Sequence, residues 1–315
     1  MKTCLITGGT GFIGSAITRL MLQKGFQVRI LDDNSRGSFR RLTDVADSLD
    51  IRIGDIRNAD LVSKSLKGVD MVIHLAYING TINFYEKPRD VLDVAIIGMQ
   101  NVLSGMQTNN VEQMYLASSS EVYQYPSIFP TPENVPLVIP DPFNARYSYG
   151  LGKIVQEFLS IHADTFLKRL AIFRPHNIYG PDMGFQHVIP ELCVKIFEAE
   201  NGRVELKGDG TQSRSFCHIS DFIQGFEILL SADIKRDIFN LGTREEVSIA
   251  HLAELIAMSL DRRVEFSNSE TPAGETNRRL PDISKIEILG YTPSMKLESG
   301  LDEYCNWYIS DQIAK

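Results

Sequence analysis

Tyr149 and Lys153 are the residues whose types and spacing most directly suggest catalysis. They lie four residues apart in a helix predicted over residues 147–167, so their side chains share one helix face. A neighbouring ammonium lowers the pKa of a phenol from its usual value near ~10, and the phenolate can then take a proton from a substrate hydroxyl. Because such a pair also occurs by chance, its meaning depends on the elements around it.

Three hydroxyl groups and a carboxylate precede this pair. Ser118, Ser119, Ser120 and Glu121 directly follow a strand predicted over residues 113–117. Serine at a strand end is most often a capping or turn residue, yet one of these hydroxyls could equally hydrogen-bond the reacting oxygen. Both interpretations stay open from the residues alone.

A glycine-rich turn lies near the N-terminus, between an apolar run at 2–7 and a helical pattern at 13–22. Gly8, Gly11 and Gly14 permit a tight turn, a close approach of backbone to a pyrophosphate, and close packing of helix on strand. The helix N-terminus behind them offers N–H groups and a positive dipole end to phosphates. This strand–turn–helix context predicts a dinucleotide-binding site.

Carboxylates follow the next strands. Asp32 ends a strand predicted over 27–31, about 20 residues after the glycines, where a carboxylate binds the ribose hydroxyls of NAD and repels the extra phosphate of NADP. Arg36 could pair with that phosphate, but the balance favours NAD. Asp55 follows a strand predicted over 51–53 and is either a solvated turn carboxylate or an adenine contact. A fourth strand, over 71–75, leads into Ala76.

Composition is typical of an enzyme without nucleic-acid or membrane partners. The chain has 315 residues, 43% of them hydrophobic, and a net charge of -8, which disfavours nucleic acid and anionic membranes. The N-terminal apolar run is too short for a signal peptide or a membrane span. The four cysteines lack CxxC spacing, so we expect no metal site, no disulfide framework and a cytoplasmic location.

The alternation of strands and helices predicts an α/β fold: a Rossmann-type doubly wound parallel sheet with a smaller C-terminal substrate-binding lobe. Residues 1–175 would form the dinucleotide-binding domain, with later returns near 215–260, and residues 176–315 mainly the lobe. We expect a long helix over 89–108, a strand over 169–174, and a late strand over 237–241 that returns to the sheet. A proline-rich loop after Tyr123 and helices over 222–230, 249–260 and 301–308 complete the prediction.

Nearly the whole chain resembles a known family, the extended short-chain dehydrogenases/reductases that act on nucleotide sugars as NAD-dependent epimerases and dehydratases. The resemblance depends on motifs at residues 7–14 (TGGTGFIG), 54–57 (GDIR), 74–76 (HLA), 118–123 (SSSEVY), 149 with 153, 174–181 (RPHNIYGP), 208–210 (GDG) and 214–216 (RSF). It implies that Ser119, Tyr149 and Lys153 are catalytic, with Tyr149 as the base and Lys153 on the nicotinamide ribose.

The resemblance also implies the remaining site residues. Ser120 and Glu121 join the catalytic set, and cofactor contacts fall on Gly8, Gly11, Phe12, Ile13, Gly14, Asp32, Asp55, Ile56, Leu75, Ala76, Tyr149 and Lys153. The nucleotide diphosphate of the substrate would contact Asn177, His187, Val188, Arg214 and Arg278. Arginine binds phosphate in a bidentate manner, although ordinary surface ion pairs are the alternative, and Arg279 is next to Arg278.

The reaction itself stays open among several members of this family. All oxidise the sugar at C4, and a glutamate after the serine, here Glu121, is typical of enzymes that then deprotonate C5. We therefore favour a dehydratase-type reaction, with 4-epimerisation, UDP-glucuronate-type decarboxylation and a non-catalytic NAD-binding protein as alternatives. Tyr77 and Gln124 depart from the usual alanine and glycine of the family. The two long helices resemble those of a family dimer interface, which predicts a homodimer.

Overall fold

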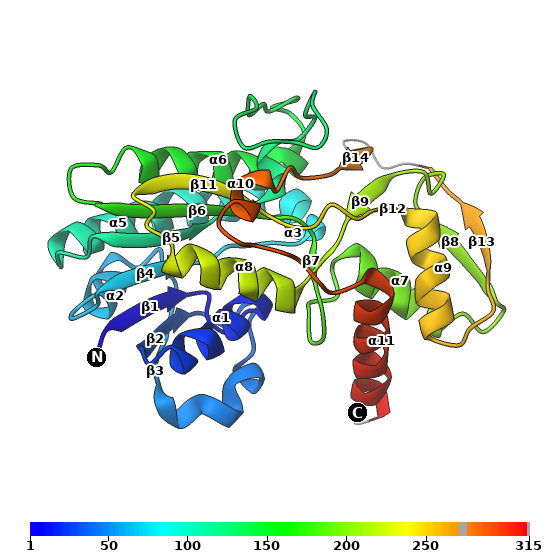
Figure 1. Ribbon diagram of the computed structural model, residues 1–315, viewed down its shortest axis with the longest axis horizontal. Helices are drawn as coiled ribbons and strands as arrows, with labels where there is room; N and C mark the ends of the chain where they lie inside the picture. Colours follow the sequence, from blue (N-terminus) through cyan, green and yellow to red (C-terminus); the bar gives the residue numbers. More distant parts are fainter. Residues whose placement is uncertain (271–275, 314–315) are drawn as a thin grey trace. The chain divides into compact units, whose positions relative to one another are not determined.

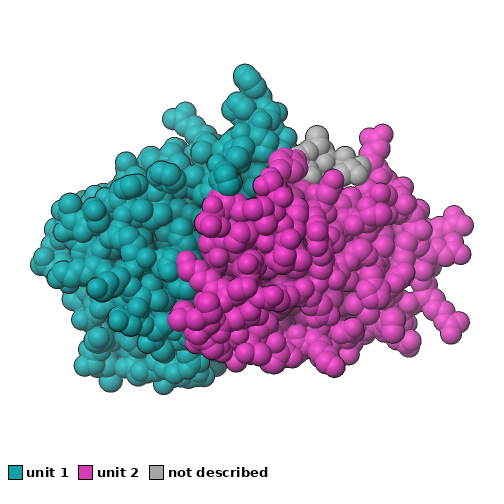
Figure 2. Space-filling view, turned by 45° about the horizontal axis from the view of Figure 1, so that its top comes forward, with its two compact units in different colours: residues 1–124, 136–175, 226–239 teal, residues 125–135, 176–225, 240–315 magenta. Residues whose placement is uncertain are grey.

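The computed structural model describes residues 1–270 and 276–313, which form two compact units. Unit 1 contains residues 1–124, 136–175 and 226–239, and unit 2 contains residues 125–135, 176–225 and 240–315 (Figure 2).

A seven-stranded sheet forms the centre of unit 1 (Figure 1). Its order is β11-β6-β5-β4-β1-β2-β3, and β1 to β6 pair in parallel. The bounds are β1 Thr3–Thr7, β2 Gln27–Asp32, β3 Leu49–Ile53, β4 Met71–His74, β5 Gln113–Ala117, β6 Arg169–Pro175 and β11 Arg236–Leu241. The chain winds outward from β1 in both directions, which places a topological switch point between β1 and β4. Ligands bind at the carboxyl ends of strands at such a point, and the predicted doubly wound fold is confirmed.

Helices cover both faces of this sheet, because consecutive strand residues point to opposite sides. Leu116 of β5 joins an apolar cluster with residues of α2 (Ala59–Ser65), α5 (Met99–Thr108) and α6 (Ser148–Ile161). The preceding residue, Tyr115, instead packs edge-on against Phe226 of α8 (Ile219–Ser231), with ring centroids 5.6 Å apart. Helix α1, Phe12–Gln23, buries Ile17 and Met21 completely.

The two predicted long helices differ in detail from the sequence pattern. Residues 88–108 form α4 (Pro88–Asp93), a π-helical turn η2 (Val94–Gly98) and then α5. The second helix, α6, begins after a 3-10 turn, η4 (Ala145–Tyr147), and ends at Ile161, six residues before the predicted end at 167. Leu167 is still fully buried in the core, which explains why the apolar pattern continues beyond the helix. The remaining short elements of unit 1 are η1 (Phe39–Ser48), α3 (Thr81–Glu86) and η3 (Ser120–Val122).

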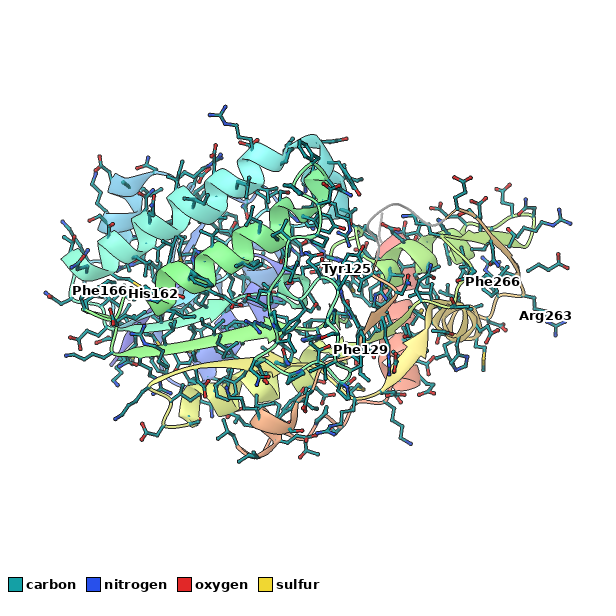
Figure 3. The ribbon with its side chains drawn as sticks, turned by 90° about the horizontal axis from the view of Figure 1, so that it is seen from above. Tyr125, Phe129, His162, Phe166, Arg263 and Phe266 are labelled. Atoms are coloured by element: carbon teal, nitrogen blue, oxygen red, sulfur yellow. The ribbon has the colours of Figure 1, made fainter. Side chains whose placement is uncertain are left out.

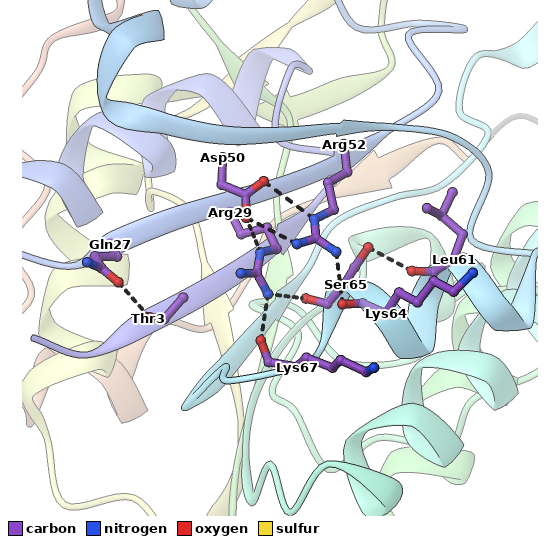
Figure 4. Close-up of polar contacts among 9 residues, drawn as sticks. All are labelled: Thr3, Gln27, Arg29, Asp50, Arg52, Leu61, Lys64, Ser65 and Lys67. Atoms are coloured by element: carbon purple, nitrogen blue, oxygen red, sulfur yellow. Dashed lines mark hydrogen bonds and ion pairs between the residues drawn. The ribbon is translucent and has the colours of Figure 1, made fainter.

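Charged side chains line the outer edge of the sheet (Figure 4). Arg29 of β2 pairs with Asp50 of the edge strand β3, and it also donates to the backbone oxygens of Ser65 and Lys67, each at 2.8 Å. Arg52 donates to the backbone oxygen of Lys64 at 2.8 Å. These two arginines satisfy carbonyl groups at the C-terminal end of α2, where helices lack intrahelical partners and favour cations.

Unit 2 contains short strands, four whole helices and the first part of α8 in its described part. Its elements are β7 (Ile178–Tyr179), α7 (Val188–Phe197), β8 (Arg203–Leu206), β9 (Ser213–Ser215), β10 (Cys217–His218), β12 (Glu246–Ser248), α9 (Ile249–Ser259), β13 (Glu265–Asn268), β14 (Arg278–Arg279), α10 (Ser284–Glu287) and α11 (Leu297–Ile313). Three small sheets pair β10 with β7, β9 with both β12 and β14, and β13 with β8.

Residues 125–135 belong to unit 2, whereas the sequence-based division assigns them to the first domain. Backbone hydrogen bonds explain the difference. The Thr131 N–H donates to the Leu280 oxygen at 2.8 Å, and the Thr131 oxygen accepts from the Asp282 N–H at 2.9 Å. These partners are about 150 residues away in sequence, beyond the reach of any local pattern.

Among the described residues, no helix combines the length and apolar character needed to cross a membrane. The four cysteines are free and buried. Within residues 1–270 and 276–313, no group of three or more His, Cys, Asp or Glu side chains is placed to hold a metal ion.

Candidate active site

The glycine-rich turn has the geometry that a dinucleotide requires. Gly8 has a φ of 74°, a left-handed conformation that favours glycine, and a Cβ on Gly14 would lie only 2.1 Å from the Gly8 oxygen. Helix α1 therefore begins directly against the turn. Its N-cap is Gly11, and no side chain caps it, so the first N–H groups of the helix point toward a ligand position. The residues present fit a bound pyrophosphate.

Asp32 is buried at the end of β2 and holds this turn in place. One carboxylate oxygen accepts from the Thr10 N–H and the other from the Asn34 N–H, both at 2.9 Å. A carboxylate has about four acceptor sites, so capacity is left for ribose hydroxyls. The predicted ribose contact is thus compatible with a second, structural role that the sequence did not reveal.

The ends of β3 and β4 lie close to the same turn. A Cβ on Gly8 would lie 2.7 Å from the Ala76 nitrogen, which brings the predicted contacts Leu75 and Ala76 to the turn. Asp55 accepts hydrogen bonds from the backbone and the guanidinium of Arg57, at 2.7 and 2.9 Å. Burial alone would raise the pKa of Asp55, but these bonds outweigh it and lower the pKa. Asp55 is therefore an ion-paired turn carboxylate here, and its adenine contact stays a prediction.

Lys153 is completely enclosed at the carboxyl end of β5. Its ammonium donates to the Ala117 oxygen at 2.7 Å and to Oε1 of Gln156 at 3.1 Å. Burial lowers the pKa of Lys153 to about 7, although Glu157 partly opposes the shift. His74 of β4 lies beside it, bonded to the Thr7 hydroxyl at 2.8 Å, and its pKa falls to about 3 because of burial and the charge of Lys153. His74 is therefore neutral near pH 7.

Tyr149 lies on the same helix among aromatic rings. The ring of Phe84 stacks on it at 4.8 Å, and the ring of Tyr77 meets it edge-on at 5.0 Å. Arg36, from the loop after β2, interacts electrostatically with Tyr149: burial lowers the pKa of Arg36, and the tyrosine partly opposes this. The sequence suggested Arg36 only as a phosphate contact, so its proximity to Tyr149 is new.

A buried ion pair that sequence reasoning missed supports this helix. Arg174, at the end of β6, binds Glu157 of α6 through two hydrogen bonds of 2.8 and 2.6 Å. The Ser118 hydroxyl donates to the same carboxylate, and Arg174 also donates to the Tyr123 hydroxyl at 2.7 Å. The partners come from three separate segments, namely the stretch after β5, helix α6 and the end of β6, which is why no local spacing indicated the cluster.

The serine–glutamate segment packs against the helix next to Tyr149. Ser119 caps the short turn η3, its hydroxyl accepting from the Glu121 N–H at 3.2 Å, and Ser120 is buried. A Cβ on Gly150 would lie 2.8 Å from the Glu121 oxygen. The Glu121 carboxylate pairs with Arg146 at 3.7 Å, and both side chains are largely buried. Unit 1 thus brings together all five predicted catalytic residues.

The predicted substrate residues lie in unit 2. Asn177 has a φ of 43° and donates to the Ser215 oxygen at 2.8 Å, while His187 and Val188 begin helix α7. Arg214 donates to backbone oxygens, including that of Ser213 at 2.8 Å. Arg278 forms a bidentate pair with Glu246 at 2.7 Å and lies 4.9 Å over the ring of Phe129, which Figure 3 labels. Their contact with a diphosphate stays a prediction.

Comparisons with known proteins identify the family. The profile of the NAD dependent epimerase/dehydratase family matches residues 4–242. A putative UDP-glucose 4-epimerase of Methanocaldococcus jannaschii is 31% identical, over 96% of this chain and 97% of its own. UDP-glucuronic acid decarboxylase 5 of Arabidopsis thaliana is 32% identical, over 94% and 86%. The solved dTDP-glucose 4,6-dehydratase of Streptomyces venezuelae, with NAD bound, has a TM-score of 0.88 at 26% identity, covering 99% of this chain and 98% of its own.

The chain therefore belongs to the NAD-dependent epimerase/dehydratase family. This membership confirms the predicted family and the predicted cofactor, NAD. The three relatives are named for three different reactions, so the family alone leaves the reaction unassigned.

The buried ion pair gives a first testable prediction. Glu157→Gln should lower the free energy of unfolding by about 3–5 kcal/mol, because it leaves the Arg174 guanidinium buried without its counter-charge. Urea unfolding followed by circular dichroism measures the change. Glu112→Gln, which breaks the exposed pair with Lys168, is the matched control and should cost about 1 kcal/mol or less. Equal losses in the two variants would contradict the structural role of Glu157.

Proposed function

We propose that this protein is a nucleotide-sugar enzyme that oxidises its substrate transiently at C4 and then moves a proton at C5, as in a dehydratase-type reaction. The observation that supports this best is the position of Glu121. Its carboxylate follows the serine segment, and its backbone packs on the residue after Tyr149. A carboxylate at this place is suited to proton transfer at a sugar carbon next to the one that Tyr149 serves.

Tyr149 acts as the base for the C4 hydroxyl in this proposal. The ammonium of Lys153 and the guanidinium of Arg36 favour its phenolate by their positive charge, and neutral His74 adds no competing charge. The Ser119 hydroxyl, which accepts one backbone hydrogen bond, still has its own proton to donate to the substrate oxygen. NAD, held at the turn of Gly8, Gly11 and Gly14 and by Asp32, would supply the hydride acceptor for C4.

Glu121 then serves the proton at C5. The ketone formed at C4 makes this proton acidic, so a carboxylate within reach can remove it. Arg146 holds the Glu121 carboxylate in place and keeps a positive charge beside it. With a hydroxyl at C6, water would leave across C5 and C6, and the hydride first taken from C4 would return to the sugar at C6. With a carboxylate at C6, carbon dioxide would leave C5 directly from the C4 ketone, without removal of the C5 proton, and Glu121 would instead supply a proton to C5.

The substrate lobe would hold the nucleotide diphosphate. The N-terminus of α7, at His187 and Val188, presents backbone N–H groups without a side-chain cap. Arg278 would exchange its pair with Glu246 for a phosphate, and Arg214 and Asn177 would line the same site. Four free, buried cysteines agree with the cytoplasmic location that we propose.

Simple 4-epimerisation is the second candidate, supported by the similarity to the putative UDP-glucose 4-epimerase. This reaction needs Ser119, Tyr149 and Lys153 but no ionisable group at position 121. Decarboxylation of a UDP-glucuronate-type substrate is the third candidate, supported by the similarity to a UDP-glucuronic acid decarboxylase. The non-catalytic alternative is the weakest, because the chain keeps the Tyr/Lys pair in an enclosed site.

Replacing the base tests the core chemistry. Tyr149→Phe should lower turnover by roughly 10²–10⁴-fold and leave NAD affinity nearly unchanged, because the phenol acts in proton transfer. Turnover is followed by mass spectrometry of products from a panel of UDP-, GDP-, CDP- and dTDP-sugars, and affinity by calorimetry. Tyr308→Phe removes a hydroxyl from helix α11 and is the matched control. Full activity of the Tyr149→Phe variant would overturn the assignment.

Replacing the glutamate separates the reactions. Glu121→Gln should block product formation but still permit oxidation at C4, visible as transient absorbance of reduced nicotinamide, because hydride transfer depends on the other residues. The native enzyme in deuterated water gives the complementary readout. Elimination removes one water and incorporates deuterium, decarboxylation removes carbon dioxide, and 4-epimerisation leaves mass and C5 unchanged. An active glutamine variant with no exchange at C5 would assign the protein to the simple epimerases.

We also propose a homodimer built on the helices over residues 88–108 and 148–161. Figure 3 shows these two helical segments side by side, and their outer side carries exposed apolar side chains, with Phe158 59% and Ile97 42% exposed. Light scattering should give twice the 35.4 kDa chain mass at micromolar concentration, and the double variant Ile97→Glu, Phe158→Glu should give one chain mass. A native mass near 35.4 kDa would argue against the dimer.

A further inference from the structure

Tyr77 contacts both members of the predicted catalytic pair. It follows β4 and Ala76, and its ring meets the Tyr149 ring edge-on, with centroids 5.0 Å apart and planes at 83°. The Lys153 ammonium lies 4.2 Å from the centroid of the same ring, within the range of a cation–π interaction. One aromatic side chain thus lies against the base and against its cation.

A glycine in α6, Gly152, leaves the space that the Tyr77 side chain occupies. A Cβ on Gly152 would lie 1.9 Å from the Tyr77 hydroxyl oxygen, so any larger residue there would displace the ring. The hydroxyl also donates to the Tyr149 backbone oxygen, at 3.5 Å. The polar end of Tyr77 therefore lies against the helix backbone, and its ring is what faces the catalytic side chains.

The ring completes the surroundings of a buried charge. An ammonium has three protons, and two of them have oxygen partners, on Ala117 and Gln156. The titratable groups around Lys153 are neutral His74 of β4, Glu157 of α6, which Arg174 binds, Tyr149 of α6, and Tyr77 itself. Burial, with the charge of Tyr149, raises the pKa of Tyr77 well above its usual value, so its ring provides a negative face without becoming an anion.

We propose that Tyr77 is a positioning residue that stabilises the charged form of Lys153 and orients Lys153 and Tyr149 for catalysis. The catalytic part of this inference depends on the proposed function. The stabilisation of the ammonium is a property of the folded chain alone, and it can be measured separately.

The inference predicts a particular pH dependence. The ammonium that favours the Tyr149 phenolate is present below the pKa of Lys153 and is lost as the pH rises through it. Removing the ring removes an interaction with the charged form only, so the pKa of Lys153 falls. The alkaline limb of the rate of C4 oxidation should then move down by roughly one pH unit.

Two kinds of substitution at position 77 separate the ring from the hydroxyl. Tyr77→Leu and Tyr77→Met remove the ring, whereas Tyr77→Phe keeps it and should leave the alkaline limb at its native pH. Phe84→Leu is the matched control, because it removes the other ring that packs on Tyr149. Circular dichroism establishes that each variant is folded, and the two aliphatic replacements guard against a folding failure in either one.

Two measurements are made on these variants. Single-turnover reduction of NAD by UDP-glucose and by UDP-glucuronate gives the rate of C4 oxidation against pH. NMR of protein labelled with 13C-lysine gives the pKa of Lys153 from its Cε resonance, assigned with Lys153→Arg, and needs no activity. We expect lower pKa values and shifted limbs in Tyr77→Leu and Tyr77→Met, and no shift in Tyr77→Phe or Phe84→Leu.

The outcomes distinguish the two proposals. An unchanged Lys153 pKa in both aliphatic variants, or an equal shift in Phe84→Leu, would overturn the role of Tyr77, whatever the substrate. A lowered pKa together with no NAD reduction by any sugar in the native enzyme would instead count against the proposed function. A lowered pKa with an unshifted limb would confine Tyr77 to stabilising the ammonium and overturn its role in catalysis.

Discussion

The bond between Glu157 and Arg174 is the interaction on which the active-site geometry of unit 1 depends. Both side chains are about 2% exposed, so the carboxylate and the guanidinium are almost fully removed from water. Burial of this kind is favourable only when the remaining donors and acceptors are also satisfied. Ser118 and Tyr123 satisfy them, and the end of β5, the end of β6 and helix α6 are thereby fixed to one another. Because α6 carries Tyr149 and Lys153, this bond sets where the predicted catalytic pair lies above the sheet.

Lys153 and His74 lie near this cluster, and these charged and titratable groups together determine the local charge. Arg174 and Glu157 offset one another, and the low pKa of His74 keeps its imidazole neutral, so the remaining charge is that of Lys153, whose pKa burial lowers to about 7. Below that pKa the ammonium adds one positive charge in a region that water does not reach, where electrostatic effects are strong. An anion nearby is therefore stabilised, and in the proposed reaction the Tyr149 phenolate is that anion. In this proposal the base arises from the surroundings of a phenol rather than from an ordinary basic side chain.

The sequence could predict this arrangement as far as local patterns reach. Apolar runs and glycines placed strands β1 to β6 within two residues of their observed ends, and the helical spacing of Tyr149 and Lys153 placed them on one helix face. The partners of these residues were out of reach, because the Glu157 cluster and the electrostatic interaction of Arg36 with Tyr149 join segments that only the tertiary fold brings together. Strands of two to four residues in unit 2 were missed for a related reason. They are too short to show a period.

The two departures from the family pattern, Tyr77 and Gln124, have a common structural consequence. Each packs where α6 has a glycine: Tyr77 at Gly152, and Gln124 at Gly150, where a Cβ would lie 2.3 Å from the Gln124 amide nitrogen. Gln124 also adopts a positive φ of 49° and donates to the Glu121 oxygen at 2.6 Å, which fixes the segment that carries the proposed C5 base.

Tyr77 and Gln124 thus both pack on the turn of α6 that carries Tyr149. Tyr77 also contacts the Lys153 ammonium, and Gln124 also binds the Glu121 segment. A side chain at either glycine would displace its neighbour, so Tyr77 requires a glycine at position 152 and Gln124 requires one at position 150. The packing around Tyr149 is consequently determined by these two pairs, Tyr77 with Gly152 and Gln124 with Gly150. The side chain at position 77 or 124 therefore has its structural effect only together with the glycine that it packs against on the helix.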